Sequence, residues 1–238
     1  MSTAAERETM TMLDTRAIET RRELAKGERR ERIVDAAWEL LREVGMDAVS
    51  IALVAERARV SPATVYNLFK TKSAVLQQVF DRDLKAFEKR IARDRASDSL
   101  ERIFRSVEIA ASLYRADPGF YRAMMYGGRS GDALYSAVSE PRIGFWQRMV
   151  AAARDDRFLV PSADAVILGV TLSQIARGAL CEWAAESISA ERLALETQLG
   201  FALVLVRFAS PGAKQTLNTR IADLESQLAG GERRRHPT

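Results

Sequence analysis

The sequence has almost no residues of the kinds that form disulfides or metal centres. Cysteine and histidine each occur once in 238 residues, as Cys181 and His236. A single cysteine excludes an intrachain disulfide and a CxxC site. A single histidine near the end of the chain excludes a His-rich metal centre and disfavours Ser-His-Asp or Cys-His catalysis. Because a Gly-rich phosphate loop and a Glu-x-x-His pair are also missing, we expect no enzymatic activity, no metal and no cofactor.

Long apolar runs are missing as well. The longest, such as Ala165–Leu172 and Phe201–Val206, fall far short of the about 20 residues that a membrane-spanning helix needs. Residues 1–16 contain no apolar segment typical of a secretory signal. With 47% hydrophobic and 29% charged residues, the chain can build a core without disulfides. We therefore expect a soluble cytoplasmic protein with no membrane partner.

Proline and glycine are scarce, with six and 13 residues respectively. Apolar residues recur every three or four positions rather than every two, and this period predicts an all-α fold. The first amphipathic helix carries Ile33, Ala37 and Leu41 on one face and is expected to end at Gly45. The fold class is therefore all-α, starting with small, closely connected helices.

Proline and serine mark the expected ends of later helices. Pro141 is expected to kink or break the helix in which it lies. Pro161 and Ser189 are expected to begin helices that reach about Ala185 and Phe208. Two segments are expected to be irregular, a loop at 127–132 and a disordered end at 230–238.

The last apolar pattern has leucine or isoleucine at a 4-3-4 spacing, as Leu217, Ile221, Leu224 and Leu228. This spacing suits a coiled-coil seam, although it covers only about two heptads. A tail helix that folds onto its own domain explains the pattern equally well. The sequence leaves these two alternatives open.

Charge is unevenly distributed although the net charge is only +4. Seven basic residues precede the first apolar helix, interleaved with glutamates: Arg16, Arg21, Arg22, Lys26, Arg29, Arg30 and Arg32. Such a segment is most often a solvated helix or a disordered arm, and an arm that binds nucleic acid is the sharper hypothesis.

Three hydroxyl side chains predict closely spaced helix starts. Ser50 is expected to cap one short helix, and Ser61 a second with Pro62 in its first turn. Thr71 is expected to cap a longer helix that follows at once. Two short helices joined by a tight turn predict a helix-turn-helix. The alternative is a plain three-helix bundle in which the second short helix is only structural.

The second short helix can present one face to a partner while Val65 and Phe69 hold it from behind. Its opposite face carries short or polar side chains, namely Ala63, Thr64, Tyr66 and Asn67. Such a face can enter the major groove of DNA, which is about 12 Å wide. At the start of the next helix, Lys72 and the first backbone N–H groups can bind a phosphate.

Residues 29–80, RRERIVDAAWELLREVGMDAVSIALVAERARVSPATVYNLFKTKSAVLQQVF, resemble the N-terminal DNA-binding domain of the TetR family of bacterial transcriptional regulators. The shared positions are Ile33-Val34-Asp35-Ala36-Ala37, Gly45, Ser50-Ile51, Val54-Ala55, Ala58, Val60-Ser61, Thr64-Val65-Tyr66, Phe69, Thr71-Lys72 and Leu76. The resemblance covers about the first third of the chain, and the remainder is similar to the family only in its helical length pattern.

The resemblance implies a set of DNA contacts. They fall on Ser50, Ser61, Ala63, Thr64, Tyr66, Asn67 and Lys72. The sequence also departs from the family pattern. Arg59 replaces the usual turn glycine, so a residue with a side chain must accept that turn, and it adds a cation near the groove. Ala52 and Leu53 replace polar residues that would contact phosphate, and Ala74 replaces the glutamate of a capping box.

The resemblance further implies a homodimer that binds a double-stranded DNA operator and an unidentified small-molecule effector. It divides the chain into a basic arm or extra helix (1–29), a helix-turn-helix domain (30–75), a helical ligand-binding and dimerisation domain (76–210), and a C-terminal helix with a disordered tail (211–238).

Small residues in the last two core helices could let helix pairs of two protomers meet closely. They are Gly169, Ser173, Ala176, Gly178, Ala179, Gly200 and Ala202. In the alternative, these positions face the core of their own protomer.

Aromatic, methionine and a few polar residues are the candidates for the effector pocket. The wider set is Phe87, Phe104, Tyr114, Phe120, Tyr121, Met124, Tyr126, Phe145, Trp146, Met149 and Trp183. The residues we predict to bind ligand are Phe104, Phe120, Tyr121, Met124, Trp146, Met149, Gln174 and Arg177. If Arg177 points inward, an anionic or acyl-type ligand becomes plausible.

The function implied by the resemblance is a ligand-responsive, sequence-specific repressor. A ligand that prefers a splayed state of the larger domain would weaken DNA binding. Repression and activation both remain open. A helical protein-interaction adaptor without sequence-specific DNA binding is the alternative function, supported by the Arg/Glu-rich arm and the tail heptads.

Overall fold

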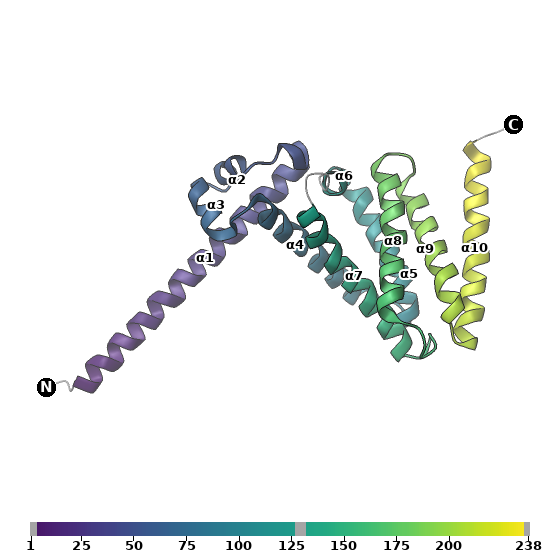
Figure 1. The fold of residues 1–238 in the computed structure, drawn as a ribbon, viewed down its shortest axis with the longest axis horizontal. Helices are drawn as coiled ribbons and strands as arrows, with labels where there is room; N and C mark the ends of the chain where they lie inside the picture. Colours follow the sequence, from purple (N-terminus) through teal and green to yellow (C-terminus); the bar gives the residue numbers. More distant parts are fainter. Residues whose placement is uncertain (1–3, 127–131, 236–238) are drawn as a thin grey trace.

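A computed structural model describes residues 4–126 and 132–235, with side chains described for 21–125 and 140–230. Within this part of the chain there are ten α-helices and a 3₁₀ turn (Figure 1). Their bounds are α1 Ala4–Ala48, α2 Ile51–Arg57, α3 Pro62–Phe69, α4 Lys72–Arg93, α5 Ser99–Ala116, α6 Pro118–Tyr126, α7 Asp132–Asp155, α8 Ala165–Ala184, α9 Ala190–Leu205, η2 Val206–Phe208 and α10 Pro211–Arg235. The all-α prediction is confirmed.

Helix α1 includes the segment that the sequence left as an arm or an extra helix. Its helical assignment runs without interruption from Ala4 up to Gly45, where φ is 75° and ψ is 170°. The predicted end of the helix at this glycine is therefore confirmed by the backbone. The first part of α1 projects away from the rest of the molecule, and α10 forms the opposite edge (Figure 1).

Side-chain caps begin the short helices where the sequence predicts them. The hydroxyls of Ser50, Ser61 and Thr71 accept hydrogen bonds from the amides of Leu53, Thr64 and Ala74, at 3.2, 3.2 and 3.0 Å. Each cap occupies an amide that has no partner inside its own helix. These bonds fix the order α2–turn–α3–α4.

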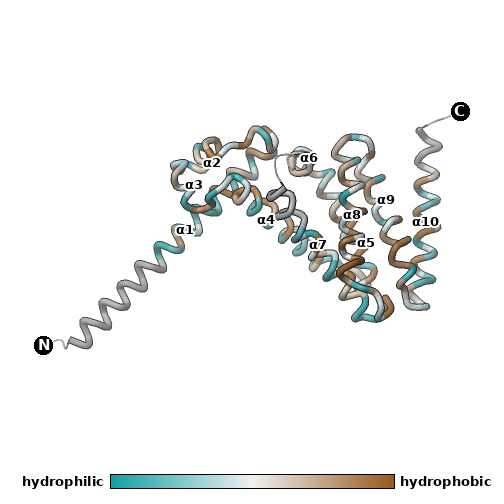
Figure 2. Tube along the Cα trace, in the orientation of Figure 1, coloured by the Kyte–Doolittle hydropathy of each residue, from teal (hydrophilic) through white to brown (hydrophobic). Residues whose placement is uncertain are grey.

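Two hydrophobic clusters hold the fold together. The first joins α1–α4 to α6 and to the neighbouring ends of α8 and α9, so Val65 and Phe69 share a core with Phe120 and Trp183. The second fills the space between α5, α7, α8, α9 and α10 around Phe201. Figure 2 shows hydrophobic segments concentrated in α5, α8 and α9, whereas the described start of α1 is hydrophilic. The first cluster thus crosses the proposed boundary at residues 75 and 76.

One predicted helix start is wrong, and one of two alternatives at a proline is excluded. Helix α7 continues through Pro141, so this proline does not break the helix, and packing against α4 and α8 offsets the one backbone hydrogen bond that a proline removes. Helix α8 begins at Ala165 rather than Pro161. The Asp164 carboxylate caps it by accepting from the amides of Val166 and Ile167 at 2.8 and 3.1 Å.

The C-terminal segment forms a longer helix than predicted. Helix α10 reaches Arg235, so residues 230–235 are helical rather than disordered, since extending a formed helix costs little. Positions 236–238 and most of the predicted 127–132 loop (127–131) lie outside the described residues, whereas Asp132 is the first residue of α7.

Helix α10 packs on its own protomer. Leu217 and Leu224 are buried, and α10 lies against α9. The Arg220 guanidinium pairs with Glu101 of α5 and stacks 4.2 Å from the centre of the Phe104 ring. Of the two alternatives for the tail pattern, the structure supports a helix folded onto its own domain.

Several small residues of α8 and α9 face neighbouring helices of the same protomer. A side-chain carbon at Gly169 would lie 2.7 Å from the Gln147 backbone in α7, and one at Gly200 would lie 2.8 Å from Ile175 in α8. Ala202 is fully buried. These residues therefore serve close packing inside the protomer, whereas Gly178 has open space around it.

Helix α8 is also long and apolar enough to cross a membrane by length and composition alone, a test that core helices of globular proteins also pass. Here α8 packs between α7 and α9.

Candidate nucleic-acid interface and ligand cavity

Helix α3 is fixed by its inner face. Val65 is fully buried and Phe69 is buried in the first cluster. From α1, the Arg30 guanidinium donates a hydrogen bond to the Leu68 carbonyl at 2.7 Å and lies 4.4 Å from the centre of the Phe69 ring. A helix of eight residues has little stability of its own, so these contacts determine its position.

The outer face of α3 carries the side chains that the sequence predicts to contact DNA. We name Ala63, Thr64, Tyr66 and Asn67 the reading face. Ala63 and Asn67 are exposed, and Tyr66 has 53% of its surface exposed. Thr64 is half-buried, with its hydroxyl 2.9 Å from the hydroxyl of Ser61. The exposed Ser61 joins this surface, while the half-buried Ser50 uses its hydroxyl as a cap at the start of α2.

The turn between α2 and α3 contains the unusual arginine. Arg59 has φ 54°, a left-handed conformation that glycine adopts without strain and other residues rarely adopt. The prediction that a residue with a side chain adopts the backbone conformation of the missing turn glycine is therefore confirmed. The Arg59 side chain is exposed beside the start of α3.

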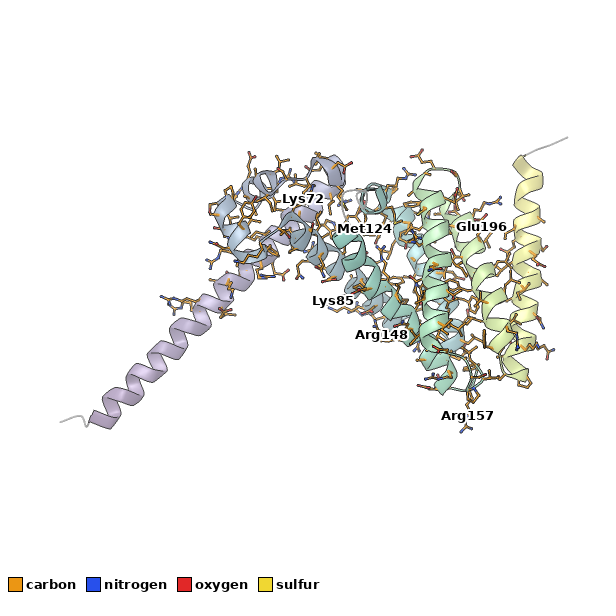
Figure 3. All side chains as sticks on the ribbon, viewed as in Figure 1. Lys72, Lys85, Met124, Arg148, Arg157 and Glu196 are labelled. Atoms are coloured by element: carbon orange, nitrogen blue, oxygen red, sulfur yellow. The ribbon has the colours of Figure 1, made fainter. Side chains whose placement is uncertain are left out.

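Lys72 at the start of α4 differs from its predicted arrangement. Its ammonium donates a hydrogen bond to the Met46 carbonyl at 2.9 Å (Figure 3). The lysine therefore ties α4 to the end of α1 and is not simply an open cation at a helix start. Two of its three donors remain for a phosphate that meets the first-turn amides.

A row of cations on α1 continues beyond the helix-turn-helix. Arg22, Lys26 and Arg29 are exposed and spaced by four and three residues, which places them on one face of the helix. We name them the basic stripe. Lys26 also pairs with Glu23 at 3.3 Å. Arg30, one residue beyond the basic stripe, contacts α3 at the Leu68 carbonyl, so the stripe ends beside the contact between α1 and α3.

The larger half contains a cavity of about 220 Å³ between α4, α5, α6, α7, α8 and α9. Five of the predicted ligand-binding residues line it, namely Tyr121, Met124, Trp146, Gln174 and Arg177. From the wider set, Phe87, Tyr114 and Phe145 also line it. The side chain of Tyr126 lies outside the described residues.

Three predicted ligand-binding residues lie elsewhere. Phe104 is buried in the second cluster beneath Arg220. Phe120 is fully buried and stacks on Trp38 of α1, with ring centres 4.2 Å apart. Met149 packs against the second cluster outside the cavity. All three sit on the apolar faces of their helices, where core packing is the commoner role.

The polar end of the cavity is built around an aspartate. The Tyr121 hydroxyl donates a hydrogen bond to the Asp83 carboxylate at 2.9 Å. Burial raises the pKa of the Asp83 carboxyl, and the Tyr121 hydrogen bond and the charge of Arg142 oppose that rise. Burial likewise raises the pKa of the Tyr121 and Tyr114 hydroxyls. Both phenols therefore stay protonated at neutral pH, and the Tyr121 hydroxyl is the donor to Asp83.

Helix α6 connects the cavity to the N-terminal helices. Its consecutive residues Phe120 and Tyr121 have different neighbours, since Tyr121 lines the cavity and Phe120 stacks on Trp38, and their two rings meet edge to face with centres 5.0 Å apart. Arg82 of α4 covers the other side of this contact, 4.9 Å from the Trp38 ring, and pairs with Asp35 of α1. The cavity wall is thus connected to α1 through side chains in direct contact.

Comparison with known proteins agrees with this arrangement. Residues 33–79 match the family model described as bacterial regulatory proteins, tetR family. The chain is also 28% identical over 181 residues to the HTH-type transcriptional repressor KstR of Rhodococcus jostii, covering 76% of this chain and 84% of that protein. These matches support the TetR family for this chain. The chain is a DNA-binding transcriptional regulator.

Other proteins are similar over a shorter segment or in fold alone. The regulator YdeS of Bacillus subtilis is 48% identical over 48 residues, which is 20% of this chain and 24% of that protein. The FadR repressor of Thermus thermophilus, solved with lauroyl-CoA, superposes with a TM-score of 0.62 at 23% identity, covering 74% of this chain and 93% of its own. SmeT of Stenotrophomonas maltophilia gives 0.59 at 22% identity over 77% and 92%.

The TetR-family motif does not point to the charged residues of the cavity, and the sequence prediction missed Asp83 and Arg142. A signal for both exists in the helical period. Asp83 lies between Phe80 and Leu84 on the inward face of α4, and Arg142 precedes Phe145 by one turn of α7. A charged residue at a core-face position of an amphipathic helix is the feature that would have identified them.

Proposed function

We propose that this TetR-family protein is a homodimeric repressor that binds a palindromic DNA operator and releases it when a small molecule occupies the cavity. The reading face carries this proposal. A two-turn helix is held by buried residues on one side, and its other side presents the exposed Ala63, Tyr66 and Asn67, two of which can form hydrogen bonds. The 28% identical relative KstR is a repressor, which favours repression over activation.

The reading face would enter the major groove with Ala63 closest to the bases. Asn67 can donate and accept on base edges, and Tyr66 can reach a phosphate with its hydroxyl. Ser61, Arg59 and the first turn of α4 would contact the sugar-phosphate backbone on either side. Ser50 and Lys72 would act mainly by positioning, since both already bond within the domain.

A dimer is needed because one reading face contacts only a half-site. Two recognition helices must stand roughly 34–36 Å apart to read successive major grooves. The exposed apolar side chains Val166 and Ile167 of α8 and Leu203 of α9, which are 61%, 64% and 51% exposed, support a pairing surface on these helices. Such a protein would work in the cytoplasm, where the chromosome is.

The effector would act through α6. A molecule in the cavity that competes with Asp83 for Tyr121 would shift α6, and Phe120 would carry the shift to Trp38 in α1. Operator affinity falls if the ligand binds the shifted state more tightly than the DNA-bound state.

The test is a selection of genomic fragments by the purified protein at moderate salt, followed by titration of the best duplex. We expect a palindromic site that binds one dimer. Tyr66→Ala should weaken this binding by about ten- to a hundredfold, which corresponds to about 1.4–2.7 kcal/mol. Lys85→Ala, a change at an exposed residue of α4 away from the reading face, is the matched control.

Two results would overturn the proposal. Recovery of fragments with no shared sequence would make the protein a general DNA-binding protein. Equal affinity of the Tyr66→Ala and Lys85→Ala variants would place the DNA contacts outside the reading face.

A further inference from the structure

The cavity combines a mostly apolar wall with a small set of charged groups. Aromatic side chains from α4 and α7, including Phe87, Phe145 and Trp146, form one side, and aliphatic side chains complete the wall. An engineered apolar cavity of about 150 Å³ holds benzene, so about 220 Å³ accommodates roughly nine or ten non-hydrogen atoms. The part of a ligand that lies inside the cavity is therefore compact and largely apolar.

Arg142 is the charged group of this wall with the poorest hydrogen bonding. It is half-buried, and among the described residues the acceptor within hydrogen-bond distance of its guanidinium is the Met124 sulfur, 3.3 Å away. A guanidinium carries five N–H donors, and a thioether sulfur is a weak acceptor. A partly desolvated cation in this setting gains free energy from any anionic acceptor that enters the cavity.

Asp83 is the acid near Arg142, but its carboxylate is not the hydrogen-bond acceptor that this guanidinium lacks. The Asp83 carboxylate accepts the hydrogen bond of the Tyr121 hydroxyl at 2.9 Å. Arg177 of α8 adds a second guanidinium to the wall. The charged residues that line the cavity in the described part of the chain are thus one aspartate and two arginines, so the wall is positive on balance.

We propose that the ligand of this cavity is a compact apolar carboxylic acid, whose carboxylate binds Arg142 and whose hydrocarbon part packs against Phe87, Phe145 and Trp146. The inference rests on the proposed function in so far as the cavity is the effector site. It adds the head-group charge, the size and the residue that selects the acid.

The first experiment compares three molecules with the same chain and different head groups. Octanoate, octan-1-ol and octylamine are titrated into the full-length protein at neutral pH, with binding followed by tryptophan fluorescence, because Trp146 lines the cavity, and by calorimetry. We expect octanoate to bind about ten- to a hundredfold more tightly than octan-1-ol, the range of one charge-assisted hydrogen-bonded contact. Octylamine should bind most weakly. Equal binding of the three, tighter binding of the amine, or no binding of octanoate would overturn the proposal.

Variants of Arg142 test the residue itself. Arg142→Gln should remove the preference for octanoate and leave the affinity for octan-1-ol unchanged, whereas Arg142→Lys should keep part of the preference. Arg148→Gln is the control, because Arg148 lies on the same helix but pairs with Glu88 on the surface (Figure 3). An unchanged preference in folded Arg142→Gln protein would exclude Arg142 as the selecting residue. Thermal unfolding of each variant shows whether it is folded.

Operator release is measured separately, with the duplex selected above. If octanoate binds through Arg142 and leaves operator affinity unchanged, the ligand assignment holds and the release mechanism fails. If a different molecule releases the operator and octanoate does not bind, the release mechanism holds and the ligand assignment fails.

Discussion

The reading face and the cavity use polar residues in opposite ways. On α3 the apolar residues Val65 and Phe69 are inside, and the polar residues face solvent with little desolvation. In the cavity, Asp83 and Arg142 occupy inward positions of α4 and α7, where burial raises the pKa of the aspartate. A surface site can thus keep an ordinary amphipathic pattern, whereas an enclosed site must break that pattern and bear the cost in stability.

The comparison is tested most strongly at Phe69 and Tyr66, which lie three residues apart on α3, because Phe69 is buried and Tyr66 is exposed. Phe69→Ala should lower the free energy of unfolding by about 3–5 kcal/mol, because it leaves a cavity in the first cluster. Tyr66→Ala should change it by less than about 0.5 kcal/mol and still weaken operator binding by about ten- to a hundredfold. Denaturant unfolding of both variants gives the two values. A large stability loss in Tyr66→Ala would show that the reading face also supports the fold.

Variants of the basic stripe test whether the DNA-binding surface extends beyond the helix-turn-helix onto the first part of α1. If Arg22, Lys26 and Arg29 contact phosphates, replacing all three with glutamine should reduce the slope of log affinity against log salt by roughly 2.7, at about 0.9 per contact. The control removes three exposed cations from α4, as Lys85→Gln, Lys89→Gln and Arg93→Gln. Identical slopes for the two triple variants would limit the DNA contacts to the helix-turn-helix.

The smallest expected effect concerns the cost of the buried acid. Because the folded-state pKa of Asp83 is raised by burial, its contribution to stability is present at low pH and is lost as pH rises through that pKa. Asp83→Asn retains an acceptor for Tyr121 and cannot ionise. It should therefore gain stability relative to the wild type as pH rises from mildly acidic to neutral. Thermal unfolding at several pH values measures this difference, with Asp81→Asn on the same helix as the control. A difference that does not grow with pH would show that the Asp83 carboxyl is not destabilised by burial.

Much of the fold follows from local sequence signals. Caps at Ser50, Ser61 and Thr71 act within a few residues, so the bounds of α2, α3 and the start of α4 could be predicted. The start of α8 could not, because Pro161 and Asp164 both resemble helix starts and only the hydrogen bonds of Asp164 decide between them. The continuation of α7 through Pro141 depends on packing with helices distant in the sequence.

The site was predictable where the motif determines it and less so elsewhere. The exposure of Ala63, Tyr66 and Asn67 follows from the helical period of α3. In the larger half, the period shows which residues point inward but not which of them border empty space, so Phe120 and Tyr121 seemed equivalent although one packs on Trp38 and the other lines the cavity. That difference depends on how six helices meet.

The shared first cluster also bears on protein engineering. A chimeric regulator can be made by joining the N-terminal DNA-binding domain of one protein to the ligand-binding domain of another. A junction after residue 75 would leave the Trp38 ring facing a foreign α6, without the Phe120 ring that stacks on it here. A working graft from this chain must therefore transfer α6 and its contact surface on α4 together with α1–α3. The DNA-binding helices and this part of the ligand-binding domain have to be exchanged as one packed unit.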